Sequence, residues 1–283
     1  MVAPPMRRAA PAAIAFAAFV GCLAAPPARA GEARCWVDRG AVVVSAAFGE
    51  ITGDFILDLA APHSLLHVDR ALSDGIVTPT ADATLSFARE RIPARFTVAS
   101  LDDRSLGLPT TINGLIGADV LAGYVVDIRL SPCRIRLWRG RAPALGPSRT
   151  LPVKMVGGVP TVGASITDGR TALAGRFGVG AGSPGVRLAA SAATLSRTPK
   201  GVDPAALYDP PARLAALGLG DEALQNLPAS LASDLPAGVL GDIGTDVWAR
   251  YGALRLDLRR DRLQLAPAAR PVSGRRRARS AGS

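Results

Sequence analysis

The sequence predicts an all-β protein of two tandem lobes, and two observations support this. Short runs rich in Val, Ile and Leu are separated by Gly, Pro and Asp, which is typical of many short strands rather than long helices. The segment 53–66 also recurs at 175–188, with Gly, Phe, Pro and the last Leu in the same places. At 283 residues the chain is long enough for two such units.

A second pair of similar segments follows the first in the same order. Residues 114–117 read Gly-Leu-Ile-Gly and precede Asp119, whereas residues 238–241 read Gly-Val-Leu-Gly and precede Asp246. The spacing between the first and second elements differs by only two residues between the halves. We therefore predict a duplicated lobe whose two copies keep the same order of strands.

These elements resemble the lobe of an aspartic protease of the pepsin and retropepsin group, over most of residues 40–266. In that family each lobe contributes one Asp to a shared site, and a hydrophobic-hydrophobic-Gly strand supports it. The resemblance implies two tandem pepsin/retropepsin-like lobes, a double β-barrel with a few short helices, and it makes Asp58 the candidate catalytic residue. The supporting residues that it implies are Ile116, Gly117, Leu240 and Gly241.

The second lobe lacks the carboxylate that the family requires. Asp58 aligns with Gly180 in the repeat. In the family, two carboxylates about 3 Å apart share one proton, so that one is the base and the other the acid. A lone carboxylate has no such partner, and a strand-end Asp that accepts hydrogen bonds from turn amides is the non-catalytic interpretation of Asp58. We therefore predict a two-lobed bacterial-type relative with a degenerate active site.

The residues after the two aligned positions also depart from the family's Asp-Thr-Gly or Asp-Ser-Gly. Leu59 and Ala181 carry no hydroxyl to brace the two loops. Ala60 loses the backbone freedom of the family's Gly, which Gly182 could retain.

The remaining elements follow from the same patterns. In the first lobe, the connection 88–93 between two expected strands comes at the same position in the order of elements as the family's flap hairpin. A solvated hairpin is the alternative interpretation. In the second lobe, segments 210–218 and 221–227 stand at the position of the flap, and their composition predicts helices. The expected strands are 41–47, 53–58, 84–87, 95–98, 125–130, 134–138, 159–166, 171–179, 256–258 and 262–265.

The predicted organisation is a signal peptide at 1–30, lobes at 31–148 and 149–268, and a basic tail at 269–283.

The first 30 residues resemble an export signal. Arg7 and Arg8 precede an apolar stretch at 9–23, and Ala-Arg-Ala at 28–30 offers a cleavage site. Cys22 also approximates a lipoprotein processing site, which is the less favoured alternative. We expect a periplasmic or secreted protein.

Removing this signal leaves two cysteines. In an oxidising compartment Cys35 and Cys133 are expected to form a disulfide. These cysteines with His63 and His67 do not match the spacing of a zinc site. We expect neither a metal nor a cofactor.

The charge of +10 is concentrated partly in the tail, which has four arginines among its last nine residues. Such a tail could contact an anionic membrane weakly. The absence of interleaved aromatic and basic residues, together with the export signal, argues against nucleic acid.

Three classes of function remain. The favoured one is an exported, catalytically degenerate protein that binds an extended peptide or partner in the cleft between the lobes. The first alternative is an active endopeptidase in which Asp58 finds a second carboxylate elsewhere. The second alternative is a structural envelope protein.

Overall fold

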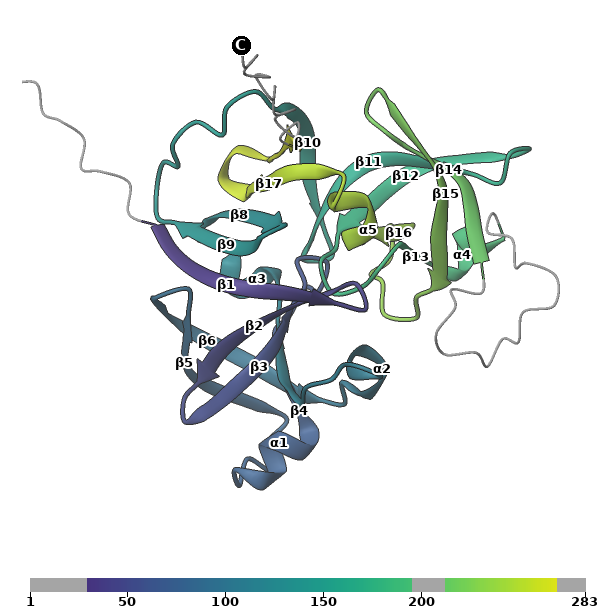
Figure 1. Cartoon of the computed structure of the whole chain (residues 1–283). Coiled ribbons are helices and arrows are strands. Elements are labelled where there is room, and N and C mark those ends of the chain that lie inside the picture. The colour runs from purple at the N-terminus through teal and green to yellow at the C-terminus, as the bar shows by residue number, and fades with distance from the viewer. Residues whose placement is uncertain (1–29, 195–211, 269–283) are drawn as a thin grey trace, which may run out of the picture.

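The computed structural model describes residues 30–194 and 212–268 (Figure 1). The chain is built mainly of strands in two lobes that share a sheet, which confirms the predicted fold class. The expected export signal up to residue 29, with Cys22, and the basic tail from residue 269 lie outside the described residues. Among the described helices, none is long and apolar enough to cross a membrane.

Lobe one contains two antiparallel hairpins, and a strand of the first hairpin also pairs in parallel with a later strand of the lobe. Its elements are β1 (Ala30–Asp38), β2 (Ala41–Phe48), β3 (Ile51–Leu57), β4 (Leu65–His67), α1 (Val68–Ser73), β5 (Thr80–Phe87), β6 (Glu90–Ala99), α2 (Asp102–Ser105), β7 (Ile112–Ile116), α3 (Ala118–Leu121), β8 (Val125–Leu130) and β9 (Cys133–Trp138). β2 pairs with β3, and β5 pairs with β6. β3 lies parallel to β7, and β4 lies between β6 and β7.

Lobe two repeats this arrangement. Its elements are β10 (Arg149–Val156), β11 (Val159–Thr167), β12 (Ala172–Val179), β13 (Val186–Leu188), α4 (Ala190–Ala193), β14 (Ala212–Leu219), β15 (Glu222–Leu231), β16 (Gly241–Ile243), α5 (Thr245–Trp248), β17 (Tyr251–Asp257), a 3-10 helix (Leu258–Arg260) and β18 (Arg262–Pro267). β12 lies parallel to β16, and β13 lies between β15 and β16. The strand order of the two lobes is therefore the same, as the repeat predicts.

The lobes are joined by an antiparallel sheet with the strand order β1-β9-β8-β17-β18-β10. The outer strands β1 and β10 also continue into their own lobes, where they pair with β2 and β11. A disulfide joins Cys35 of β1 to Cys133 of β9, with the two Cα atoms 4.9 Å apart. The expected disulfide is therefore present, and it is compatible with an exported protein.

The expectation of helices at 210–218 and 221–227 is wrong. Residues 212–219 and 222–231 form the hairpin β14–β15, which is the counterpart of β5–β6 in lobe one. Side chains are buried at Ala212, Leu214, Leu217 and Leu219. Ala and Leu favour helices intrinsically. Pairing of β14 with β11 and β15 overrides that preference, because it buries alternate side chains, at 212 and 214 in the first half of the strand and at 217 and 219 in the second.

The connection 88–93 does not lie over Asp58, so its interpretation as a flap is wrong. Ala88 and Arg89 form the turn of the hairpin with φ of 52° and 60°. The backbone of Ala88 packs against Gly31 of β1. Glu90 accepts a hydrogen bond from the Tyr124 hydroxyl at 3.3 Å, which holds this end of the hairpin on the base of its own lobe.

Two reciprocal contacts hold the lobes together beside the site. The β1–β2 turn reaches lobe two at Gly40, where a Cβ would lie 2.2 Å from the Pro184 nitrogen. The β10–β11 turn reaches lobe one at Gly158, where a Cβ would lie 2.9 Å from the Pro62 Cβ. Each lobe thus places a glycine turn against a proline of the other lobe.

Candidate functional site

Hydrogen bonds define which residues of the two lobes are equivalent. The Asp58 nitrogen donates to the Ile116 oxygen at 3.0 Å, and the Gly180 nitrogen donates to the Ile243 oxygen at 2.9 Å. Asp58 and Gly180 therefore occupy matching positions, as the repeat of 53–66 at 175–188 implies. Ile243, rather than Leu240, is the counterpart of Ile116.

The predicted match of 114–117 with 238–241 is thus wrong by three residues. The second element of lobe two is 241–244, which reads Gly-Asp-Ile-Gly. Gly241 lies in β16 beside Phe177, and Gly244 takes the place of Gly117. The polar Asp242 interrupts the hydrophobic pattern of this element, so the neighbouring Gly-Val-Leu-Gly matches better by sequence alone.

Asp58 lies at the end of β3 and is 1% exposed. Its Oδ1 accepts hydrogen bonds from the Ala60 and Ala181 nitrogens, both at 3.0 Å. Its Oδ2 accepts a hydrogen bond from Arg104 Nη2. Both oxygens of Asp58 are therefore occupied, one by amides of the two lobes and the other by a guanidinium.

The position of Gly180 is enclosed, although it has no side chain. Its carbonyl accepts a hydrogen bond from the Trp248 indole at 2.8 Å. A Cβ at Gly180 would lie 3.6 Å from the Cβ atoms of both Ala60 and Asp242. Asp242, from the neighbouring strand β16, thus borders the space where an Asp at residue 180 would project.

Asp242 forms an ion pair inside lobe two. Its Oδ2 lies 3.0 Å from Arg187 Nη1, and the two residues are register partners on β16 and β13. Asp242 is 1% exposed, and its Oδ1 has no hydrogen-bond partner among the described residues. The equivalent pair in lobe one consists of Leu65 and Leu115.

Asp234 connects these two ion pairs across the junction of the lobes. Its Oδ2 lies 3.0 Å from Arg104 Nη1, and its Oδ1 accepts a hydrogen bond from Arg187 Nη2. Its side chain is 51% exposed, whereas those of Arg104 and Arg187 are 16% and 13% exposed. We call the connected residues Asp58, Arg104, Asp234, Arg187 and Asp242 the charge network.

The surroundings of the charge network shift several pKa values. Burial raises the pKa of Asp242 to about 7, although Arg187 opposes this, and Asp58 raises it further. Burial acts against the charge on Arg187, but Asp242 and Asp234 outweigh it and raise its pKa. Burial likewise opposes ionisation of Asp234, but Arg187 and Arg104 lower its pKa overall. Asp242 is therefore the member that changes charge near neutral pH.

A comparison with solved structures finds the crystal structure of an aspartic proteinase from Irpex lacteus at a TM-score of 0.54. The match covers 87% of this chain and 99% of that one, at 13% sequence identity. This chain has the fold of an aspartic proteinase. At this identity the likeness shows the fold alone. No family model and no curated protein matches the chain.

The charge network lies at the junction of the two lobes, beside the matching strand ends Asp58 and Gly180. Proteolysis by a pair of carboxylates needs a proton-sharing dyad that can activate water. Here Gly180 has no carboxylate, Asp58 is bonded to Arg104, and Asp242 is bonded to Arg187. The arrangement binds the lobes to each other by ion pairs.

The sequence pattern singles out Asp58 but none of the other four members of the network. One usable signal was present: the repeat aligns Arg187 with Leu65, so a charge replaces an apolar side chain. Asp242 opposite Leu115 gives the same signal once the register is known. Arg104 and Asp234 lie outside the repeated motifs, and sequence spacing does not bring them together.

His67 has a structural role in lobe one. His67 Nδ1 accepts a hydrogen bond from the Asp69 nitrogen and caps α1. Its Nε2 lies 3.2 Å from Asp102 Oδ1 and so connects α1 to α2. In residues 30–194 and 212–268, no group of three or more His, Cys, Asp or Glu is arranged to hold a metal ion.

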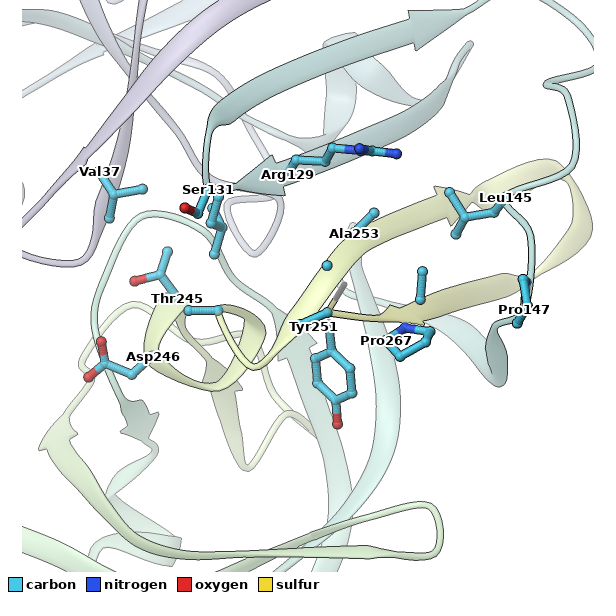
Figure 2. Close-up of a pocket in the computed structure, with 15 residues that line it drawn as sticks. Val37, Arg129, Ser131, Leu145, Pro147, Thr245, Asp246, Tyr251, Ala253 and Pro267 are labelled. Atoms are coloured by element: carbon cyan, nitrogen blue, oxygen red, sulfur yellow. The ribbon is translucent and has the colours of Figure 1, made fainter. Parts of the chain in front are cut away.

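A cavity of about 640 Å³ lies where β8 and β17 diverge beyond the pair Ile128–Leu254 (Figure 2). Two of its polar side chains are already engaged. Asp246 accepts a hydrogen bond from the Gly185 nitrogen at 3.2 Å, and Thr245 donates one to the Gly40 oxygen at 2.7 Å. Arg129 and Ser131 also line the cavity, but buried ionisable side chains gather in the charge network, and we place the candidate site there.

Proposed function

We propose that this protein is an exported, catalytically inactive protein of the aspartic-proteinase fold, which binds an extended peptide or partner segment between its lobes. The observation that carries the proposal is the state of Asp58. Its carboxylate is buried and accepts hydrogen bonds from Ala60, Ala181 and Arg104. A general base for water must present an oxygen to it within about 3 Å, whereas Asp58 is 1% exposed and both of its oxygens already accept hydrogen bonds.

The binding role is supported by the form of the junction between the lobes. Arg104 of α2 and Asp234 of the loop between β15 and β16 meet there, one from each lobe. Neither of these segments is part of a sheet, and Asp234 is half exposed. Segments of this kind can yield to a ligand without unfolding the strands behind them.

The test is a proteolysis assay between pH 3 and 7, where carboxylate dyads titrate. Denatured casein serves as the substrate, with the wild type, Asp58→Asn and the surface control Asp82→Asn compared side by side. We expect no cleavage by any of them. Binding is measured separately with fluorescently labelled peptide libraries, and the wild type and Asp82→Asn should bind alike.

An active endopeptidase is the second candidate, because lobe two does supply a buried carboxylate in Asp242. In that case cleavage should disappear in both Asp58→Asn and Asp242→Asn but persist in Asp82→Asn. This pattern would overturn the inactive assignment and make Asp242 the second carboxylate of the pair.

A further inference from the structure

We propose that Arg104 and Arg187 form a carboxylate-binding site between the lobes, which the side chain of Asp234 fills in this structure. The ligand that we infer is an acidic residue of an extended peptide. This inference rests on the proposed peptide binding and specifies which chemistry the peptide must carry.

The two guanidiniums are arranged to hold one carboxylate between them. Arg104 Nη1 contacts Oδ2 of Asp234 at 3.0 Å, and Arg187 Nη2 donates to Oδ1. Each oxygen of the carboxylate thus faces a different lobe. Charge-assisted contacts of this kind are stronger than neutral hydrogen bonds and select for the planar shape of a carboxylate.

Both arginines are held in place from behind. Arg104 Nη2 donates to Asp58, and Arg187 Nη1 lies 3.0 Å from Asp242. The two side chains are 84% or more buried, since their exposed fractions are 16% and 13%. A ligand would therefore meet two guanidiniums whose orientation is already set, which lowers the cost of ordering them on binding.

Asp234 can be replaced more easily than the other members of the network. It is the half-exposed member, and it lies between β15 and β16 rather than in a strand. Without Asp234, the guanidiniums of Arg104 and Arg187 would face only Asp58 and Asp242. Because burial raises the pKa of Asp242 to about 7, that carboxyl is neutral at lower pH. The vacated site would then carry an excess positive charge, which an incoming carboxylate neutralises.

A peptide fits this site better than a free acid does. Asp234 is tethered, so its effective concentration at the arginines is high, in the millimolar range for a flexible tether. A competitor needs further contacts to displace it. Leu106 and Leu231 are exposed by 57% and 66%, and each is within three residues of a network member on its own lobe. They offer apolar contacts to residues that flank an acidic side chain.

The experiment uses an acetylated and amidated six-residue peptide with one Asp between two Leu, and its Asn counterpart. Calorimetry at pH 6 and low salt measures their binding to the wild type, Asp234→Ala and the control Asp221→Ala. Asp221 is also a surface Asp paired with an arginine, Arg149, but it lies outside the network. Asp234→Asn is the second variant, for use if Asp234→Ala unfolds at a lower temperature than the wild type.

We expect the Asp peptide to bind Asp234→Ala at least tenfold more tightly than the wild type, with no such gain for the Asn peptide or for Asp221→Ala. Adding Arg104→Gln to Asp234→Ala should abolish the gain. Equal binding of both peptides to all variants would overturn the arginine site while leaving peptide binding intact. No binding of either peptide to any variant would overturn both proposals. A tenfold gain that acetate alone reproduces would assign the site to a small acid instead.

Discussion

The two lobes share one fold but differ at the positions that matter for chemistry. Where lobe one pairs Leu65 with Leu115, lobe two pairs Arg187 with Asp242. Where lobe one ends its strand in Asp58, lobe two has Gly180. Lobe two therefore lacks a carboxylate at the strand end and has one on the adjacent strand instead.

This difference shows which partners an ionised side chain requires when it is buried in a β-sheet. A buried carboxylate is costly unless it is paired and hydrogen-bonded. Lobe two meets this requirement through Arg187, whose remaining donor reaches Asp234 and so connects to Arg104 of the other lobe. The ion pair inside lobe two is thus connected through Asp234 to a residue of lobe one, whereas the leucine pair of lobe one needs no ionic partner.

Among the described residues, only lobe one carries a crosslink, and removing it should have the largest effect. The disulfide closes a loop with a sequence separation of 98 residues. For a loop of this length, Cys35→Ala with Cys133→Ala should lower the free energy of unfolding by about 4 to 5 kcal/mol. Urea unfolding monitored by tryptophan fluorescence measures this. A loss below about 1 kcal/mol would show that the bond does not constrain lobe one.

The charge on Asp242 should make lobe two sensitive to pH. Its folded pKa of about 7 lies above the ordinary value of 3.8, so its contribution is fully present below about pH 4 and is lost as the pH rises through 7. The loss amounts to roughly 4 kcal/mol. Asp242→Asn should remove this decline while leaving the acid side unchanged, where Asp234 and Glu32 have lowered pKa values. Urea midpoints between pH 4 and 8 measure both, and identical profiles for the two proteins would contradict the assignment.

Converting lobe two to the pattern of lobe one should reveal the cost of a broken ion pair. Arg187→Leu leaves Asp242 buried without its partner and should lower the free energy of unfolding by about 3 kcal/mol at pH 7. Adding Asp242→Leu recreates the leucine pair of lobe one. The double variant should regain most of the loss, because two apolar side chains need no ionic partner. Chemical denaturation of both variants tests this, and a double variant less stable than Arg187→Leu would contradict it.

The smallest expected effect is at the position two residues after Asp58 in lobe one and two residues after Gly180 in lobe two. Lobe one has Ala60, and lobe two has Gly182, where a Cβ would lie 2.7 Å from Asp58 Oδ2 and from Arg104 Nη2. Gly182→Ala should therefore cost about 2 kcal/mol by forcing the lobes apart. The reverse change, Ala60→Gly, should cost about 1 kcal/mol through backbone entropy. Thermal unfolding compares them, and equal costs would mean that the junction adapts to the added methyl group.

The class of fold and part of the site follow from patterns in the sequence. Runs of β-branched and aliphatic residues between Gly and Pro predict short strands, and the repeat of 53–66 at 175–188 predicts two equivalent lobes. These features are local, because the alternation of side chains and the conformations of turns depend on neighbours in the chain. The missing carboxylate at Gly180 and the pairing of the two cysteines could be inferred from the same information.

The other features depend on contacts between distant segments of the chain. Residues 212–219 are a strand because β11 and β15 pair with them, in spite of their helical composition. The register of 241–244 depends on which residues β12 meets, since the polar Asp242 makes the neighbouring segment 238–241 the better match by sequence. Arg104 reaches Asp58 and Asp234 across separations of 46 and 130 residues. Contacts of that range arise from how the lobes pack, because no local preference of the chain brings such distant residues together.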